Sequence, residues 1–436
     1  MSERRDAIII GTGIIGAATA FELAKLGYRT LSVDKLPAAG YGSTSNTCAI
    51  VRASYSTWDG VAMAYEGFSY WEDWENYIGV PDDAGLAKYI DCGTVQLKTS
   101  EDEHWRKTLR QYDAVGVSYE EWDLATVLGR LPVLSPGSFH PPKRPGDDAF
   151  WDEPESDLLG AIYTSESGYV SDPQLATRNL TTAAISLGSR FRYNAEVIEI
   201  RQSDATVTGI TLASGEQIDA PVVVNVAGPH SFVINTMAGV EDQMNIKTRA
   251  LRHEVHHVPS PPGYDFGSDG MHVSDGDIGT YFRPETGNHI LVGSEDPECD
   301  PKVWVEDPDA YNMAVTREAW DAQVLRLARR IPELPVPSQP KGVVDLYDVS
   351  DDWIPIYDRS SLDGLYMAVG TSGNQFKNAA VVGYCMATLI DAVEHGQDHD
   401  NDPVQVGQRY KGMTLDMGFY SRNREINPDS SFSVNG

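Results

Sequence analysis

The chain has 436 residues, a length typical of two or three lobes, and 41% of them are hydrophobic, which is ample for buried cores. Its 34 lysines and arginines stand against 64 aspartates and glutamates, giving a formal net charge of −30. This composition excludes a disordered chain. It also argues against nucleic acid or an anionic membrane surface as a partner, because both require clustered cations.

Signals for disulfides, metals or membranes are weak. The four cysteines lie far apart and lack zinc-ligand spacing. His253, His256 and His257 lie close together, but they fall in a predicted strand and no second ligand cluster accompanies them. The apolar runs 7–10 and 379–390 are too short for a signal peptide core and a membrane span, respectively. We therefore expect free thiols, no metal, no membrane span and a cytoplasmic protein.

Residues 6–35 predict a strand, a glycine-rich turn, a helix and a second strand. The turn holds Gly11, Gly13 and Gly16 in the spacing G-x-G-x-x-G, which permits a tight turn, backbone approach to a pyrophosphate and close helix packing. Asp34 ends the second strand, 18 residues after Gly16, where a carboxylate accepts hydrogen bonds from ribose hydroxyls. The unit predicts a dinucleotide site. Asp34 disfavours NADP, but the motif alone leaves NAD and FAD open.

Four further segments carry a family resemblance. They read GYGSTSNTCAIVRASY (40–55), GYVSDPQLAT (168–177), PVVVNVAGPHS (221–231) and GLYMAVGTSGNQFKNAAVVG (364–383). Their order and content resemble the FAD-dependent amine and amino-acid oxidoreductases, a family that includes D-amino-acid oxidase, glycine oxidase and monomeric sarcosine oxidase. The resemblance implies FAD, because the last segment lies beside the flavin ring in that family and would have no task in a pure NAD enzyme.

The resemblance implies an α/β fold, with a Rossmann-like FAD-binding domain and a second α+β substrate domain built on an antiparallel sheet. Since the cofactor motifs lie far apart, we expect a discontinuous FAD-binding domain over 1–87, 155–235 and 340–436. The stretches 88–154 and 236–339 are expected to form the substrate-binding domain. The strand-rich runs within them are 88–98, 246–257 and 280–293.

The resemblance also implies which residues contact FAD. They are Gly11, Gly13, Ile14, Ile15, Gly16, Asp34, Lys35, Gly42, Ser43, Thr44, Thr47, Cys48, Val197, Ala227, Gly228, Gly370, Gly373, Asn374, Gln375, Phe376 and Lys377. Some relatives attach FAD covalently through a histidine in the early loop or a cysteine before the last motif. Here residues 44–47 contain no histidine and residues 340–357 no cysteine, so we expect non-covalent FAD.

Arg52 and Lys377 are the expected substrate clamp, because relatives resembling monomeric sarcosine oxidase grip the substrate carboxylate with an arginine and a lysine at these positions. Arg52 follows apolar residues, and a guanidinium in such a place needs a partner. A structural ion pair with one of the many acids is the open alternative. Tyr281 matches a tyrosine of the substrate pocket, with an ordinary core tyrosine as the alternative. Asn374 is expected to contact flavin or substrate.

The implied reaction is oxidation of the C–N bond of an amine or amino acid by hydride transfer to the flavin. The imine product would hydrolyse in water, and oxygen or another acceptor would reoxidise the flavin. The lysine that helps activate oxygen in sarcosine oxidase aligns near Leu291, so a dehydrogenase stays open beside an oxidase.

Two alternatives stay open. The first is an FAD dehydrogenase of a hydroxy acid or polyol phosphate, for which Arg249, Arg252 and Arg283 would be the phosphate ligands. The second is a flavoprotein subunit of a larger complex that docks through its acidic face and its polar tail, 420–436. The tail would pack on the body of the protein or on a partner, and a homo-oligomer also stays open.

Overall fold

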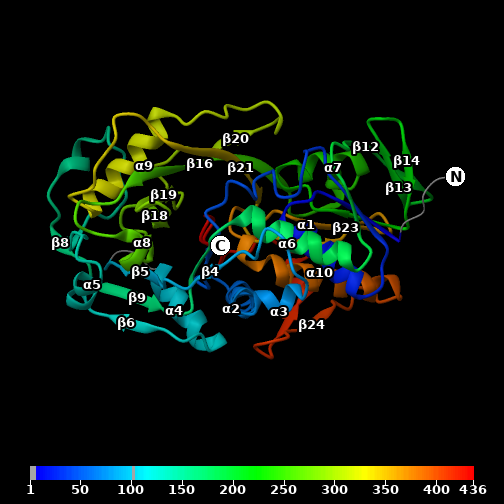
Figure 1. Cartoon of the computed structure of the whole chain (residues 1–436), viewed down its shortest axis with the longest axis horizontal. Coiled ribbons are helices and arrows are strands. Elements are labelled where there is room, and N and C mark those ends of the chain that lie inside the picture. Colours follow the sequence, from blue (N-terminus) through cyan, green and yellow to red (C-terminus); the bar gives the residue numbers. More distant parts are fainter. Residues whose placement is uncertain (1–5, 101–103) are drawn as a thin grey trace.

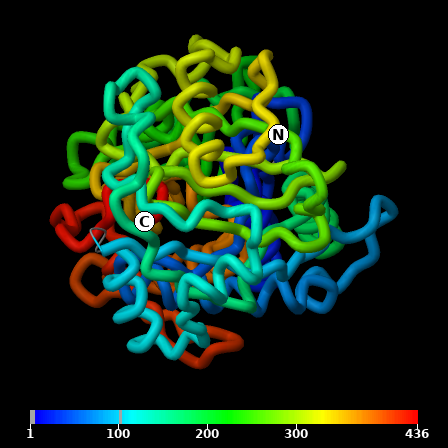
Figure 2. Tube along the Cα trace, turned by 90° about the vertical axis from the view of Figure 1, so that its left-hand side faces the viewer, coloured from blue at the N-terminus to red at the C-terminus, as the bar shows by residue number. Residues whose placement is uncertain are grey.

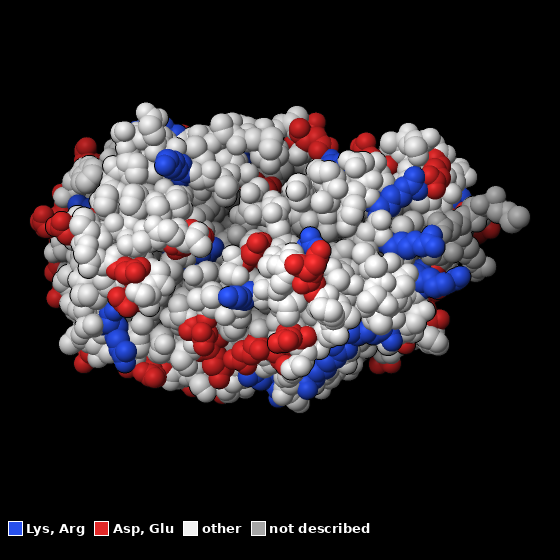
Figure 3. Space-filling model, in the orientation of Figure 1, with Lys and Arg blue, Asp and Glu red and all other residues white. Residues whose placement is uncertain are grey.

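Two lobes lie side by side along the long axis of the molecule (Figure 1). The computed structural model describes residues 6–100 and 104–436. One lobe is built around a mainly parallel sheet and the other around a mainly antiparallel sheet. Acidic side chains are spread over both lobes on the face shown in Figure 3, as expected for solvation of a strongly acidic surface.

Short apolar runs form the sheet of the first lobe. In spatial order its strands are β11 (Arg190–Arg192), β2 (Thr30–Val33), β1 (Ala7–Ile10), β15 (Val222–Asn225), β23 (Leu365–Val369) and β22 (Ile356–Arg359). All neighbours run parallel except β22, which is antiparallel to β23. Every residue of β1, β2, β15 and β23 is buried, because both faces of the sheet are covered.

Successive side chains of these strands face different layers. Ile9 and Val224 pack with helices α1 (Ile14–Lys25), α6 (Pro173–Ser186) and α10 (Ala379–Glu394). Ile8 and Val223 pack on the other face with a meander and a helix. These are β12 (Val197–Ser203), β13 (Thr206–Leu212), β14 (Gln217–Asp219) and α7 (Ser231–Ala238).

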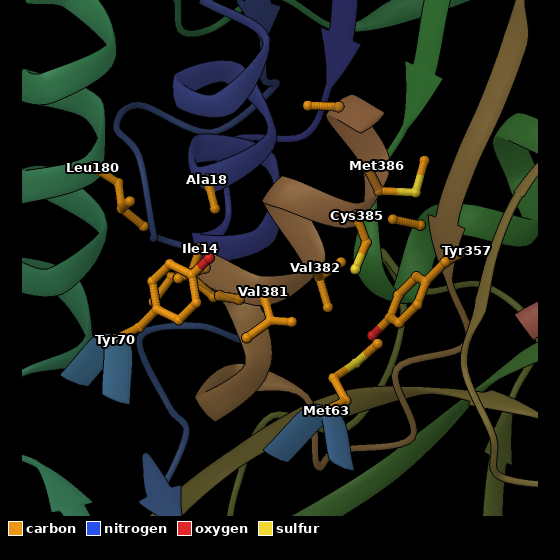
Figure 4. Packing of buried hydrophobic residues seen from close by; sticks show 14 of the residues in the cluster. Ile14, Ala18, Met63, Tyr70, Leu180, Tyr357, Val381, Val382, Cys385 and Met386 are labelled. Carbon is orange, nitrogen blue, oxygen red and sulfur yellow. The ribbon is translucent and has the colours of Figure 1, made fainter. Parts of the chain in front are cut away.

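Helix α10 packs on α1 at close range, within a cluster of buried side chains that includes Ala18 of α1 and Val382 of α10 (Figure 4). A Cβ atom added at Gly383 would lie 2.6 Å from the main-chain carbon of Ala18, so a larger residue would force the helices apart. With the short 3-10 turn η4 (Phe376–Asn378), the helical stretch Phe376–Glu394 has the length and apolar composition of a membrane span. However, 67% of its apolar window is buried inside the fold, which is typical of a core helix.

The second lobe holds a nine-stranded sheet. Its strands are β20 (Val303–Val305), β16 (Thr248–Pro259), β19 (His289–Ser294), β18 (Thr280–Glu285), β17 (His272–Asp275), β5 (Thr94–Lys98), β9 (Gly160–Thr164) and β6 (Glu120–Trp122), with β21 (Gly342–Ser350) also paired to β16. Strands β9 and β21 fall in ranges that the sequence assigned to the cofactor lobe, but their pairing places them in this sheet. The sheet is therefore wider than the ranges 88–154 and 236–339 implied.

Smaller elements complete the chain. The other strands are β3 (Ile50–Val51), β4 (Tyr89–Ile90), β7 (Gly137–Ser138), β8 (Ser156–Asp157), β10 (Gly168–Val170), β24 (Gln405–Gly407) and β25 (Thr414–Asp416). The other helices are α2 (Trp58–Glu72), α3 (Trp74–Ile78), α4 (His104–Val115), α5 (Leu124–Arg130), α8 (Phe266–Asp269) and α9 (Arg317–Arg330), with 3-10 turns η1 (Asp148–Trp151), η2 (Gly228–His230), η3 (Glu241–Gln243) and η5 (Met417–Tyr420). Strands β3 and β10 pair, which joins the early loop to the segment before α6.

Candidate active site

A cavity of about 740 Å³ lies between the lobes, within the size range of small-molecule and cofactor sites. The first lobe contributes the turn after β1, the loop before β3, the start of β12, η2 and the turn after β23. The second lobe contributes strands β16, β17, β18 and β21 and the loop after β20. Segments far apart in the sequence therefore meet around one space.

The turn after β1 forms a cradle with no room for side chains. Gly11 has φ +109°, and an added Cβ would lie 2.3 Å from the carbonyl oxygen of Val226. Helix α1 starts at Gly13 with no side-chain cap, so backbone N–H groups and the positive end of the helix dipole face the cavity. Thr44 Oγ1 accepts from the Ile14 N–H at 3.2 Å. This arrangement suits a pyrophosphate.

Asp34 lies next to this turn in a fixed orientation. Its Oδ2 accepts from the N–H of Thr12 at 2.7 Å and from the Thr12 hydroxyl at 2.8 Å, and its Oδ1 accepts from the N–H of Leu36 at 2.9 Å. Carboxylate oxygens have further lone pairs, so Asp34 can still accept from ribose hydroxyls.

Part of the cavity wall is apolar and open to solvent. Ile198, Val233 and Met313 line it, and each of them is more than a third exposed. Such a surface fits a flat aromatic base. Asp309, from the second lobe, forms an ion pair with Lys35 and lies 3.0 Å from His230 Nε2. Burial and the neighbouring Lys35 lower the pKa of His230. The contacts of Asp309 with Lys35 and His230 link the two lobes beside the cavity.

The residues expected to contact FAD line this one cavity, with the single exception of Gly370. Gly370 has φ +67° and packs against the second lobe, where an added Cβ would lie 2.9 Å from Cβ of Ser350. Its N–H donates to Asp348 Oδ2 at 2.6 Å. Gly370 therefore shapes the turn after β23 and does not face the cavity.

The expected substrate residues Arg52, Tyr281, Asn374 and Lys377 line the same cavity. Arg52 and Lys377 are only 7% and 3% exposed. Lys377 Nζ donates to the carbonyl of Asn374 at 2.6 Å. Burial, and then the charge of Arg52, hold the pKa of Lys377 well below that of an ordinary lysine.

Neither Arg52 nor Lys377 forms an ion pair with a carboxylate anywhere in the described part of the chain. The alternative that Arg52 is a structural ion pair is therefore not observed. Its Nη1 and Nη2 donate to main-chain carbonyls instead, those of Ser54, Val434 and Asn435. The Arg52 guanidinium and the Lys377 amino group thus face the cavity with neutral partners.

The sequence analysis missed three residues that line the cavity, which are Tyr347, His272 and Asp348. The Tyr347 ring lies against the turn after β23, so that a Cβ at Gly373 would lie 2.4 Å from it, and it stacks on His253 at 4.1 Å between ring centroids. His272 Nδ1 lies 3.0 Å from Thr94 Oγ1. Burial and the nearby charge of Arg52 lower the pKa of His272 well below its usual range, so its imidazole is neutral.

Asp348 is the third missed residue. Burial raises its pKa to about 7. Asp348 lines the cavity, and hydrogen bonds from the Gly370 N–H and from the Ser231 and Thr248 hydroxyls offset part of the effect of burial on its pKa. No motif surrounds these residues on strands β17 and β21, so sequence reasoning had no signal for them.

The arginines of the phosphate alternative lie outside the cavity. Arg252 pairs with Glu254 at 2.6 Å and Arg283 with Glu285 at 3.1 Å, while Arg249 covers the ring of Trp304 at 4.0 Å. Among the described residues, no group of three or more His, Cys, Asp or Glu side chains has the arrangement of a metal site.

Comparisons with known proteins agree with this geometry. The profile of the family described as "DAO: FAD dependent oxidoreductase" matches residues 6–389. Sarcosine oxidase subunit beta from Rhodobacter capsulatus is 23% identical over 89% of this chain and 85% of its own length. Glycine oxidase from Geobacillus kaustophilus is 24% identical over 91% of this chain and 96% of its own length. The crystal structure of L-proline dehydrogenase from P. horikoshii superposes with a TM-score of 0.76 at 19% identity, covering 98% of this chain and 100% of that one.

The cavity has a glycine cradle at a helix N-terminus and an oriented carboxylate, Asp34, which fit the pyrophosphate and ribose of FAD, and the fold is the α/β architecture expected from the sequence. FAD supplies a two-electron acceptor when it is bound. The residues that would hold it belong to the turn after β1, the early loop, η2 and the turn after β23. The chain belongs to the DAO family of FAD-dependent oxidoreductases and is an enzyme whose cofactor is FAD, held without a covalent bond.

Proposed function

We propose that this enzyme oxidises the C–N bond of a small amine or amino acid that carries a carboxylate, by hydride transfer from the carbon bearing nitrogen to FAD. The observation that carries the proposal is the pair of buried basic side chains, Arg52 and Lys377, that line the cavity without a carboxylate partner in the described chain. A buried charge is costly unless it is paired, and an anionic substrate would provide the missing partner.

The side chain of Arg52 still has donors available for such a substrate. Its described acceptors use Nη1 and Nη2, and none of them accepts from Nε. A guanidinium has five N–H donors, so the edge formed by Nε and the second N–H of Nη2 can hold a carboxylate with two hydrogen bonds. Lys377 would add the second positive charge. Fixing the carboxylate orients the C–H bond of the substrate, which is catalysis by positioning.

The same cations act on the substrate nitrogen. Positive charges in a buried site disfavour an ammonium group and favour the neutral amine, whose lone pair is needed for hydride loss. His272 is neutral and adds no further positive charge to the site. Tyr281 and Tyr347 supply apolar ring surface beside the substrate.

The acceptor that reoxidises the cofactor belongs to a second proposal. The sequence aligns Leu291 near the oxygen-activating lysine of sarcosine oxidase, and Leu291 packs against an apolar cluster with Cys48 and Tyr281. The missing cation favours a dehydrogenase with an acceptor other than oxygen. The Rhodobacter relative is named as a subunit, so assembly with a partner subunit or a second copy, like the cytoplasmic location, stays a prediction.

Anaerobic reduction of the bound FAD tests the proposed substrate class. We expect at least one N-substituted or free amino acid to bleach the yellow absorbance, while the matching amine without a carboxylate does so far more slowly. Bleaching by hydroxy acids or polyol phosphates, with no reaction by any amine, would refute the proposal in favour of the alternative that the sequence left open.

A further inference from the structure

The C-terminal segment, residues 430–436, passes beside the cavity between the lobes. Both views place the C-terminal end well inside the outline of the molecule (Figure 1, Figure 2). Ser430 and Val434 are only 5% and 6% exposed, and Val434 and Asn435 line the cavity. Of the two sequence expectations for the tail, the structure shows packing on the body of the protein.

Two side chains of the expected substrate site, Arg52 and Asn374, hold this segment by its main chain. Arg52 Nη2 donates to the carbonyl of Val434 at 2.8 Å, and Nη1 donates to that of Asn435 at 3.4 Å. Asn374 Nδ2 also donates to the Val434 carbonyl, at 3.2 Å. The segment therefore contacts two residues that the sequence assigned to the substrate site.

The two ends of the segment are anchored elsewhere. The Ser56 hydroxyl donates to a main-chain oxygen of Gly436 at 2.6 Å, and the Ser430 hydroxyl donates to the carbonyl of Asp352 at 2.5 Å. Anchors on both sides of Val434 fix its position relative to the cavity.

The acceptors that Arg52 meets are neutral. Carbonyl oxygens orient a guanidinium but leave its positive charge uncompensated, whereas a carboxylate would cancel it. Holding Nη1 and one N–H of Nη2 leaves the Nε edge of Arg52 for a substrate anion. The segment therefore orients the guanidinium of Arg52 and leaves its positive charge without a compensating anion.

The side chain of Val434 fills space beside the substrate residues. It belongs to an apolar cluster with Cys48, Val255, Tyr281 and Trp353. Its methyl groups therefore limit the room next to Tyr281, on the same side of the cavity as Arg52.

We propose that the C-terminal segment is the specificity wall of the substrate site: the carbonyls of Val434 and Asn435 aim Arg52, and the Val434 side chain limits the bulk of the group that a carboxylate substrate carries beside Tyr281. This inference rests on the proposed function, because it takes Arg52 as the carboxylate ligand.

Binding of two unreactive carboxylates, followed through the visible absorbance of bound FAD, tests the wall. Acetate is the small probe and 3,3-dimethylbutyrate the branched one. Because one methylene in a pocket changes discrimination by about tenfold or more, we expect Val434→Ala to shift the ratio of the two dissociation constants about tenfold toward the branched probe. Val434→Leu should shift it in the opposite direction.

Phe432→Ala is the matched control, since Phe432 lies in the same segment but is 39% exposed and outside the cavity. It should leave the ratio unchanged. FAD content and thermal unfolding of each variant establish that it is folded. A ratio that stays within twofold of wild type in both Val434 variants overturns the wall and leaves the proposed function intact. If acetate does not bind the wild-type holoenzyme at all, the carboxylate clamp fails, and the wall falls with it.

Discussion

Replacement of Arg52 by alanine should weaken the binding of a carboxylate much more than that of its neutral amide. Arg52 is almost fully buried, and no acid neutralises it in the described chain. Its charge is therefore available to an anion in a site from which most water is excluded, where an interaction between charges is stronger than at the surface.

The size of the effect follows from the donors that would be lost. A hydrogen bond to a charged group contributes about 1.5–3 kcal/mol, and truncating one partner of a buried charge pair costs roughly 2–5 kcal/mol. Lys377 keeps part of the positive charge, so we take a loss of about 3 kcal/mol. That value corresponds to a dissociation constant raised about a hundredfold.

Titration of the FAD-loaded enzyme with acetate and with acetamide, followed by visible absorbance, measures this loss. Arg52→Ala also frees the carbonyls of Val434 and Asn435, and this structural effect should weaken both probes alike. The charge effect should appear for acetate alone. Arg52→Lys keeps the charge but offers a single donor group, so its affinity for acetate should fall between those of the wild type and Arg52→Ala. Equal weakening of acetate and acetamide would refute the assignment of Arg52 as the carboxylate ligand.

Three further predictions follow from the site and the core. Because burial and Arg52 lower the pKa of Lys377 and a bound anion would raise it again, acetate should bind more tightly as the pH falls through that lowered pKa, and Lys377→Met should abolish this dependence in the same titration. Denaturation of the holoenzyme should release yellow FAD into the supernatant, and colour that stays with the precipitated protein would contradict non-covalent binding. Gly383→Ala should destabilise the fold by about 1–3 kcal/mol through overpacking against Ala18, seen as a lower thermal midpoint, whereas Gly129→Ala in α5, which has no neighbour within 4 Å, should not.

The cofactor end of the site could be predicted from the sequence because its chemistry depends on the backbone. Gly11 and Gly16 must be glycine, because an added Cβ would lie 2.3 Å and 2.1 Å from main-chain carbonyl oxygens, and this requirement leaves a fixed spacing in the sequence. Arg52 and Lys377 were found only through the family resemblance. Their lack of a carboxylate partner is a fact of the fold and has no signature in composition.

The rest depends on pairing between distant strands. His272 meets Thr94 because β17 lies beside β5, although 178 residues separate them in the chain. Likewise β9 and β21 join the second sheet by long-range pairing, which no local pattern reveals. The contacts of Val434 with Arg52 use its main-chain carbonyl, a group that every residue has, so the sequence could not indicate them.

The central claim is that the carbon bearing nitrogen loses a hydride to FAD while a carboxylate is held at Arg52 and Lys377, and that water then hydrolyses the imine product. The most direct test is a single anaerobic turnover with an acyclic amino acid that bleaches the FAD, in which released ammonia or amine is counted against reduced FAD after hydrolysis of the imine. The account predicts one equivalent of released amine for each FAD reduced, and little release with Arg52→Ala at the same substrate concentration. Full reduction of FAD without release of any amine would contradict it.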